Sequence, residues 1–174
     1  MKKKLFGNYD IKDLKDFYIF DKPNPNGITL QGIWLLTDEE YENNHSFVQW
    51  MFPIANLSLH NLYAPRLDKE IIEELKNDDE IILNIQMSYI VYLNYLGITY
   101  DEEQKRYVMG IDFDNRKKLW LTKNNHNFKR IARCLKCLRL FSLDNFAQAF
   151  IDVLKDIDKS NPGIITKKEW KYWK

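Results

Sequence analysis

The chain has 174 residues, of which 45% are hydrophobic, 14% aromatic and 29% charged. This length fits one well-filled core, and so large an apolar share excludes a disordered chain. The formal net charge of +1 gives no global attraction to nucleic acids or anionic membranes. We therefore expect a single domain over residues 1–174 that folds unaided.

We expect neither a secretory signal nor a membrane-spanning segment in this chain. The N-terminal Met-Lys-Lys-Lys is followed by Gly7-Asn-Tyr-Asp before an apolar stretch can form, which argues against a signal peptide. The longest apolar stretch, residues 81–96, is interrupted by Asn84, Gln86 and Asn94 and is too polar to span a bilayer. Two cysteines spaced within a helical pattern indicate a reducing compartment. These features predict a cytoplasmic protein.

Apolar residues recur at helical spacing along most of the chain. The predicted helices cover residues 11–20, residues 37–52, residues 69–76, a long segment that ends at Leu96, a segment from Asn125 or Asn127 to Leu138, a segment from Ser142 to Leu154, and a short segment after Thr166. Between residues 98 and 125 the pattern is weaker: residues 107–113 fit a short strand, but helix and loop are favoured. The prediction is an all-α, single compact domain of about six helices with little or no β-structure.

The segment from Thr37 to Pro53 has the clearest helix signals. Thr37 and Glu40 form a capping-box pattern, and the Pro53 ring ends a helix at the preceding residue. Within one continuous helix, His45 and Gln49 lie one turn apart and present an imidazole and an amide to the same space. Such a pair either binds a ligand or forms a buried polar network that holds the loop after Pro53.

Trp50 and the segment after residue 125 supply the other candidate binding residues. Trp50 either stacks on a ligand or belongs to the core. His126, Arg130 and Arg133 lie near the start of a helix, where free amides and the helix dipole favour an anionic partner. The alternatives are a solvated basic face or pairing with the acidic segment over residues 68–103.

Catalytic and metal-binding patterns are missing from the sequence. Cys134 and Cys137 have no second pair of ligands at zinc spacing, so we expect core cysteines. Ser46 is adjacent to His45, which on a helix points the two side chains apart. We predict no catalytic residue, no metal and no cofactor, and a hydrolase of uncatalogued type is the weakest alternative.

Two separated motifs carry a resemblance to a known family. The motifs are Tyr41-Glu-x-x-His-Ser-Phe-Val-Gln-Trp-Met-Phe-Pro53 and His126-Asn-Phe-Lys-Arg-Ile-Ala-Arg-Cys-Leu-Lys-Cys-Leu138, with Asn61-x-x-Ala64 and Leu93-x-x-Leu-Gly-Ile98 between them. In order and spacing they resemble the conserved region of the opioid growth factor receptor family. The resemblance covers about residues 14–154, which we take as the core of the domain. The composition, rich in Lys, Asn and Ile, predicts a bacterial-type member.

The resemblance implies a receptor-like binding protein, because vertebrate members are described as receptors for the pentapeptide Met-enkephalin that restrain growth at the nucleus. Our leading hypothesis is a non-catalytic module that binds a peptide or protein partner in a groove between residues 41–52 and residues 126–138. The alternative is nucleic-acid binding through the acid-free basic segment of residues 116–139, with Trp120, His126 and Phe128 available for base stacking.

Overall fold

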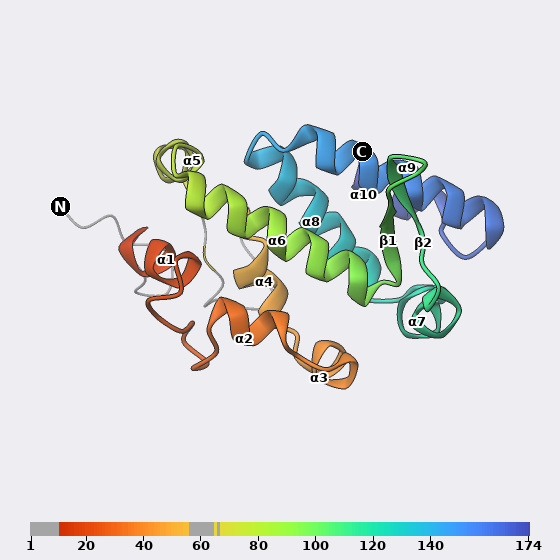
Figure 1. Cartoon of the computed structure of the whole chain (residues 1–174), viewed down its shortest axis with the longest axis horizontal. Coiled ribbons are helices and arrows are strands. Elements are labelled where there is room, and N and C mark those ends of the chain that lie inside the picture. The colour runs from red at the N-terminus through yellow and green to blue at the C-terminus, as the bar shows by residue number, and fades with distance from the viewer. Residues whose placement is uncertain (1–10, 56–64, 66) are drawn as a thin grey trace. The chain divides into compact units, whose positions relative to one another are not determined.

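Helices dominate the structure, as the periodicity predicts (Figure 1). The computed structural model describes residues 11–55, 65 and 67–174. In this part of the chain there are ten helices: α1 (Ile11–Tyr18), α2 (Leu30–Trp34), α3 (Asp38–Asn43), α4 (Phe47–Met51), α5 (Lys69–Lys76), α6 (Asp79–Tyr95), α7 (Phe113–Trp120), α8 (Asn127–Leu140), α9 (Asp144–Ser160) and α10 (Lys167–Trp173). Two short strands, β1 (Ile98–Asp101) and β2 (Arg106–Met109), form the only sheet described.

Tertiary contacts divide the chain into two compact units, residues 1–88 and residues 89–174. The division falls within α6, the long apolar helix that the sequence predicts. The single domain over residues 1–174 therefore stays a prediction.

The first unit contains short helices joined by polar turns. The buried Tyr18 of α1 donates its hydroxyl to the backbone carbonyls of Trp50 and Met51, both at 3.1 Å. The Asn84 amide on α6 donates to the Tyr18 carbonyl at 2.8 Å. These bonds satisfy polar groups that the core would otherwise leave unpaired, and they hold three segments distant in sequence together.

The second unit begins with the β-hairpin that follows α6. Gly97 has φ of 78°, the left-handed geometry expected of a helix C-cap, and its carbonyl accepts from Gly110 at 2.8 Å. The strands pair antiparallel, with Ile98 opposite Met109 and Asp101 opposite Arg106. Helix and loop were favoured over residues 107–113, and this was wrong for residues 107–109, which belong to β2. Tyr107 and Val108 are an aromatic and a β-branched residue, the types that favour strands.

Aromatic side chains fill the core of the second unit. Trp120 at the end of α7 donates its indole N–H to the Leu96 carbonyl, and Trp173 of α10 donates to the Phe128 carbonyl, each at 3.0 Å. The Phe128 ring meets the Trp173 ring edge to face at a centroid distance of 5.8 Å. Each indole thus contributes apolar area to the core and has its own buried N–H satisfied by a backbone carbonyl.

Sequence reasoning missed α2 and α7 and undercounted the helices. The Thr29 side chain caps α2 by accepting from the Gly32 amide at 3.0 Å, but α2 has only five residues and shows no repeated apolar period. The Asn61-x-x-Ala64 motif lies outside the described residues.

Candidate functional site

The segment predicted as one helix over residues 37–52 is two short helices, and the prediction of a continuous helix was wrong. The capping box at Thr37 is present and starts α3, but Asn44 has φ of −95° and ψ of 108°, which is extended backbone. Its side-chain oxygen accepts from the Ser46 amide at 2.9 Å and from the Phe47 amide at 3.3 Å. An asparagine that binds the backbone ahead of it competes with helix, so the chain turns here and restarts as α4.

This turn borders an open pocket of about 680 Å³ in the first unit. Most of the lining residues have polar side chains, and they come from α3, α4 and the loops beside α2 and α3: Asn26, Ile28, Leu36, Glu40, Asn43, Asn44, His45, Ser46 and Gln49. His45 and Gln49 therefore line one pocket, although the chain turn rather than a shared helical face brings them together. His45 is exposed, and Gln49 is buried at 7% exposure.

Amide side chains dominate the chemistry of the pocket. Three asparagines and one glutamine line it, and each carries both a donor and an acceptor. Asn26 donates to the Ser46 hydroxyl at 2.9 Å, and that hydroxyl donates to Asn44 at 2.8 Å, so two distant segments share one polar wall. Sequence reasoning missed Asn26, although the Asn-Pro-Asn-Gly loop that contains it was recognisable as a turn.

Glu40 gives the pocket a fixed negative charge. Its carboxylate accepts from the Thr37 backbone amide and from the Thr37 hydroxyl, each at 2.8 Å. These bonds, the backbone bond first, hold the pKa of Glu40 below its ordinary value, so the group is ionised at neutral pH. A ligand with a donor or a cation fits this end of the pocket.

Trp50 does not line the pocket. Its side chain is 2% exposed, and its ring meets Phe17 at a centroid distance of 5.2 Å in an edge-to-face contact. Of the two alternatives for this residue, the structure favours the core.

The second group of predicted site residues lies on α8, in the other unit. His126 is the N-cap residue and is exposed, whereas Arg130 is 5% exposed and donates to the Asn127 side chain at 3.0 Å. Arg133 is half-buried. The groove predicted between residues 41–52 and residues 126–138 would join the two units, and it stays a prediction.

The basic segment of residues 116–139 offers little for base stacking. Trp120 is fully buried and Phe128 is 4% exposed, so the expectation that both rings are available to bases was wrong. Arg116 pairs with Asp112 at 3.0 Å, and Lys117 pairs with Asp114 at 2.5 Å. Two of the basic side chains are therefore paired with acidic residues at the start of α7, just before residue 116.

Comparison with known proteins decides the family. The family described as "Opioid growth factor receptor (OGFr) conserved region" matches residues 8–162. The chain belongs to the opioid growth factor receptor family. The match includes both motifs that carry the resemblance, and it extends a few residues beyond each end of the core predicted over residues 14–154.

Curated relatives agree with this family. "Opioid growth factor receptor-like protein 1" of Xenopus tropicalis is 30% identical over 149 residues, which is 79% of this chain and 29% of the relative. The protein of the same name from Rattus norvegicus is 29% identical, over 82% of this chain and 31% of its own length. The "Opioid growth factor receptor" of Homo sapiens is 29% identical, over 70% of this chain and 18% of its own length.

The chain thus spans less than a third of the length of these relatives. They are all vertebrate proteins, which lends no support to the bacterial origin predicted from composition. No solved structure matches the chain.

The family member carries no sign of a metal centre in the part of the chain that the structure describes. No group of three or more His, Cys, Asp or Glu side chains there is placed to hold a metal ion. Cys134 and Cys137 are both buried, and burial raises the pKa of each thiol, which confirms the core interpretation. Likewise, no helix among the described residues is long and apolar enough to cross a membrane.

Proposed function

We propose that this chain is a non-catalytic module that binds a peptide or protein segment in the open pocket beside His45. The observation that carries the proposal is the lining: three asparagines, a glutamine, a histidine and a carboxylate line an open pocket of about 680 Å³, together with the apolar Ile28 and Leu36. Side-chain amides match the alternating donors and acceptors of a peptide backbone, and the volume lies within the range of ligand pockets. The names of the relatives, which include a receptor for a growth factor, support a binding role.

The chemistry around His45 supports binding over hydrolysis. The neighbouring Ser46 hydroxyl already donates to Asn44 and accepts from Asn26, so it takes part in a wall of the pocket. A hydroxyl nucleophile requires a base within hydrogen-bond reach, and Ser46 instead bonds two amides. The hydrolase alternative is accordingly the weaker one.

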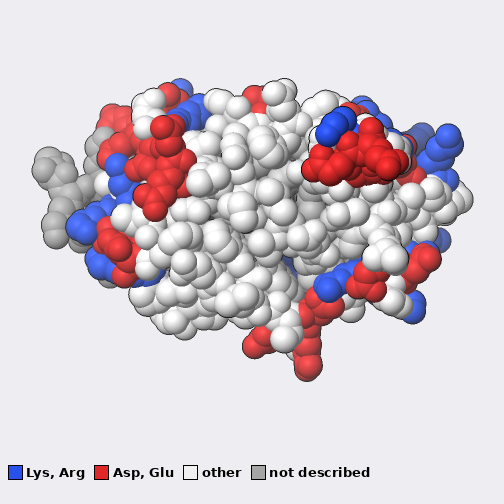
Figure 2. Space-filling model, viewed as in Figure 1, with Lys and Arg blue, Asp and Glu red and all other residues white. Residues whose placement is uncertain are grey.

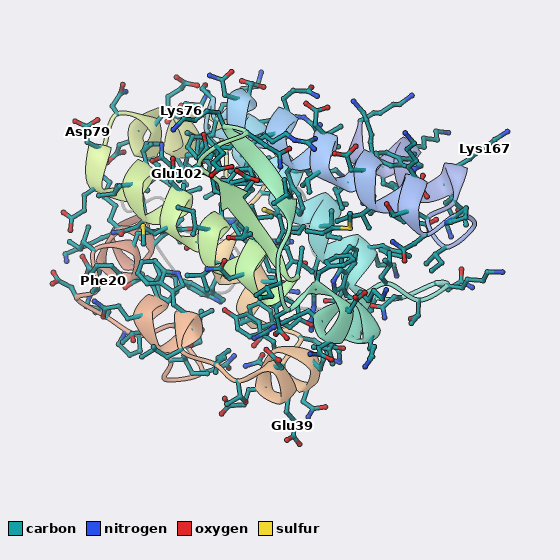
Figure 3. All side chains as sticks on the ribbon, turned by 45° about the vertical axis from the view of Figure 1, so that its right-hand side comes forward. Phe20, Glu39, Lys76, Asp79, Glu102 and Lys167 are labelled. Carbon is teal, nitrogen blue, oxygen red and sulfur yellow. The ribbon has the colours of Figure 1, made fainter. Side chains whose placement is uncertain are left out.

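The test is titration of the full chain with fluorescein-labelled Met-enkephalin and with peptides selected from a random phage-displayed library. For any peptide that binds the pocket, His45→Ala and Asn43→Ala should each weaken binding about tenfold, since both residues are exposed and line the pocket. Glu39→Ala is the matched control, because Glu39 lies on α3 and projects away from the fold (Figure 3).

Unchanged affinity of every selected peptide for both pocket variants would overturn the proposal. The nucleic-acid alternative enters the same experiment as a labelled duplex at low salt. It rests on the exposed lysines of the basic segment, Lys118, Lys123, Lys129 and Lys136. Duplex binding that falls steeply with added salt, with no peptide bound, would favour that alternative.

A further inference from the structure

One edge of the β-hairpin in the second unit has free backbone groups. In an antiparallel ladder, residues alternate between those that bond the partner strand and those that point away from it. Gly97 accepts from Gly110 at the start of this ladder, so Thr99 and Asp101 are the β1 residues that bond β2. The N–H and C=O groups of Ile98 and Tyr100 then point to the outer edge, where no described residue binds them.

This outer edge borders a groove of about 510 Å³ within residues 89–174. The groove is lined by one face of α6 and by the hairpin: Ile90, Leu93, Asn94, Ile98, Thr99, Tyr100 and Tyr107. Its floor includes apolar surface that the fold leaves in contact with solvent, because Ile90 is 38% and Tyr100 43% exposed. The groove therefore combines unpaired strand groups with uncovered apolar side chains, two features that folded proteins usually avoid together.

Ring contacts and an ion pair connect the hairpin to α6 and α9. Tyr107 meets Tyr100 edge to face at 5.2 Å and also meets the buried Tyr89 of α6 at 5.6 Å. The hairpin is fixed at its turn end by the Arg106 guanidinium, which bonds Asp156 of α9 at 2.7 Å. A ligand strand would thus meet a preformed edge rather than one that must first become ordered.

The turn between β1 and β2 carries negative charge. Asp101, Glu102 and Glu103 follow one another where β1 ends, and Figure 2 shows acidic atoms gathered at this turn above an uncharged surface over the strands. Figure 3 shows Glu102 at the same end of the hairpin. Lys105 pairs with Glu102 at 3.1 Å, which leaves Glu103 to attract a cation brought by a partner.

We infer that β1 is a docking edge for an extended peptide segment that carries Lys or Arg next to β-branched or other apolar residues. The segment adds a third strand by bonding the outward groups of Ile98 and Tyr100, and its inward side chains cover Ile90. Its basic residue lies at the Glu103 end, and the Tyr100 ring offers a second favourable contact to that cation. This site is separate from the pocket beside His45 and goes beyond the function proposed above.

The experiment selects random octapeptides displayed on phage against the full chain and measures the affinity of the most enriched synthetic peptide. Tyr100→Pro removes the outward N–H but no ladder bond, and Tyr100→Ala removes the ring alone. We expect the Pro variant to bind at least tenfold more weakly than the Ala variant. Ile90→Glu should abolish binding, and Glu103→Lys should weaken it several-fold and remove most of its salt dependence.

Thermal unfolding of each variant separates lost binding from lost folding, and only variants with a native transition are compared. Selection of no peptide, or of peptides that bind Tyr100→Pro as well as Tyr100→Ala, would overturn the inference. Peptides that respond to His45→Ala but not to Ile90→Glu would overturn it too, while supporting the pocket. A dimer that forms without peptide and is lost in Tyr100→Pro would show instead that β1 pairs with a second copy of the chain.

Discussion

The two units of this chain use polar side chains in different ways. In residues 1–88, asparagines shape turns: Asn24 accepts from the amides of Asn26 and Ile28, and Asn44 accepts from those of Ser46 and Phe47. In residues 89–174, the buried Trp120 and Trp173 instead bond distant backbone carbonyls through their indole N–H groups. The first arrangement gives a polar pocket on short helices, and the second gives a cohesive core. In this chain, turns therefore form the pocket proposed to bind a ligand, and indoles contribute to the core of the second unit.

Substitution of Trp173 gives the strongest test of this contrast between the two units. This side chain is fully buried, and its N–H bonds the Phe128 carbonyl at 3.0 Å. Trp173→Ala should lower the free energy of unfolding by about 3 to 5 kcal/mol, because it leaves a large cavity in the core. Hydrogen exchange with mass spectrometry should show lost protection in residues 89–174, with residues 1–88 less affected.

Tyr172→Ala is the control for this change, since Tyr172 is 57% exposed and should tolerate truncation. Equal loss of protection in both halves of Trp173→Ala would break the comparison. It would instead support the single cooperative domain predicted over residues 1–174.

Gly97 and Gly27 allow a comparison between the units at the level of the backbone. Both have positive φ, at 78° and 77°, but a Cβ at Gly97 would lie 2.9 Å from the Cα of Phe113, whereas Gly27 has open space. Gly97→Ala should cost about 2 to 4 kcal/mol, because strain and a backbone clash add, and Gly27→Ala about 1 to 2 kcal/mol from strain alone. Urea unfolding measures both. An equal loss of unfolding free energy in the two variants would mean that the hairpin can shift away from α7 with no loss of stability.

Local signals predicted the parts of the fold that local physics decides. The capping box predicted at Thr37 is present, and Thr166, Asp68 and Gly97 likewise have the cap geometry typical of their residue types, because each cap depends on a few neighbouring residues. The turn at Asn44 was missed, since the apolar spacing continues through it and conceals the competing side-chain bonds. Strand β2 was the less favoured of two alternatives, because four residues form a strand only when a partner strand is present.

The candidate site was predicted in part. His45 and Gln49 line the pocket, but its opposite wall comes from Asn26 and Ile28, which no spacing rule connects to residues 43–49. The burial of Trp120 and Phe128 could not be predicted, because both lie in a basic segment. Trp120 is buried where its indole bonds the Leu96 carbonyl, and Phe128 is covered by Trp173 of α10. Residue type therefore indicated which groups can bind, and tertiary structure decided which of them are accessible.

The smallest expected effect concerns stability at acid pH. We expect it to be larger in the first unit, which contains a buried carboxylate. Asp16 is 5% exposed and accepts from Lys12 at 2.8 Å and from Lys22 at 2.7 Å. These bonds, Lys12 first, hold the pKa of Asp16 below its ordinary value of 3.8. The resulting stabilisation is complete above pH 3.8 and is lost as the pH falls through the lowered native pKa, because the unfolded state then binds the proton more readily.

Unfolding of the wild type and of Asp16→Asn in urea, from about pH 6 to about pH 2, measures this contribution. The free energy of unfolding should differ most between the two proteins near neutral pH, and the difference should shrink at the acid end. Asp152→Asn is the control in the second unit, because the Asp152–Lys155 pair is more than half exposed on both sides and is screened by solvent. A larger pH-dependent loss in Asp152→Asn than in Asp16→Asn would reverse the assignment, since the acid-sensitive contact would then belong to residues 89–174.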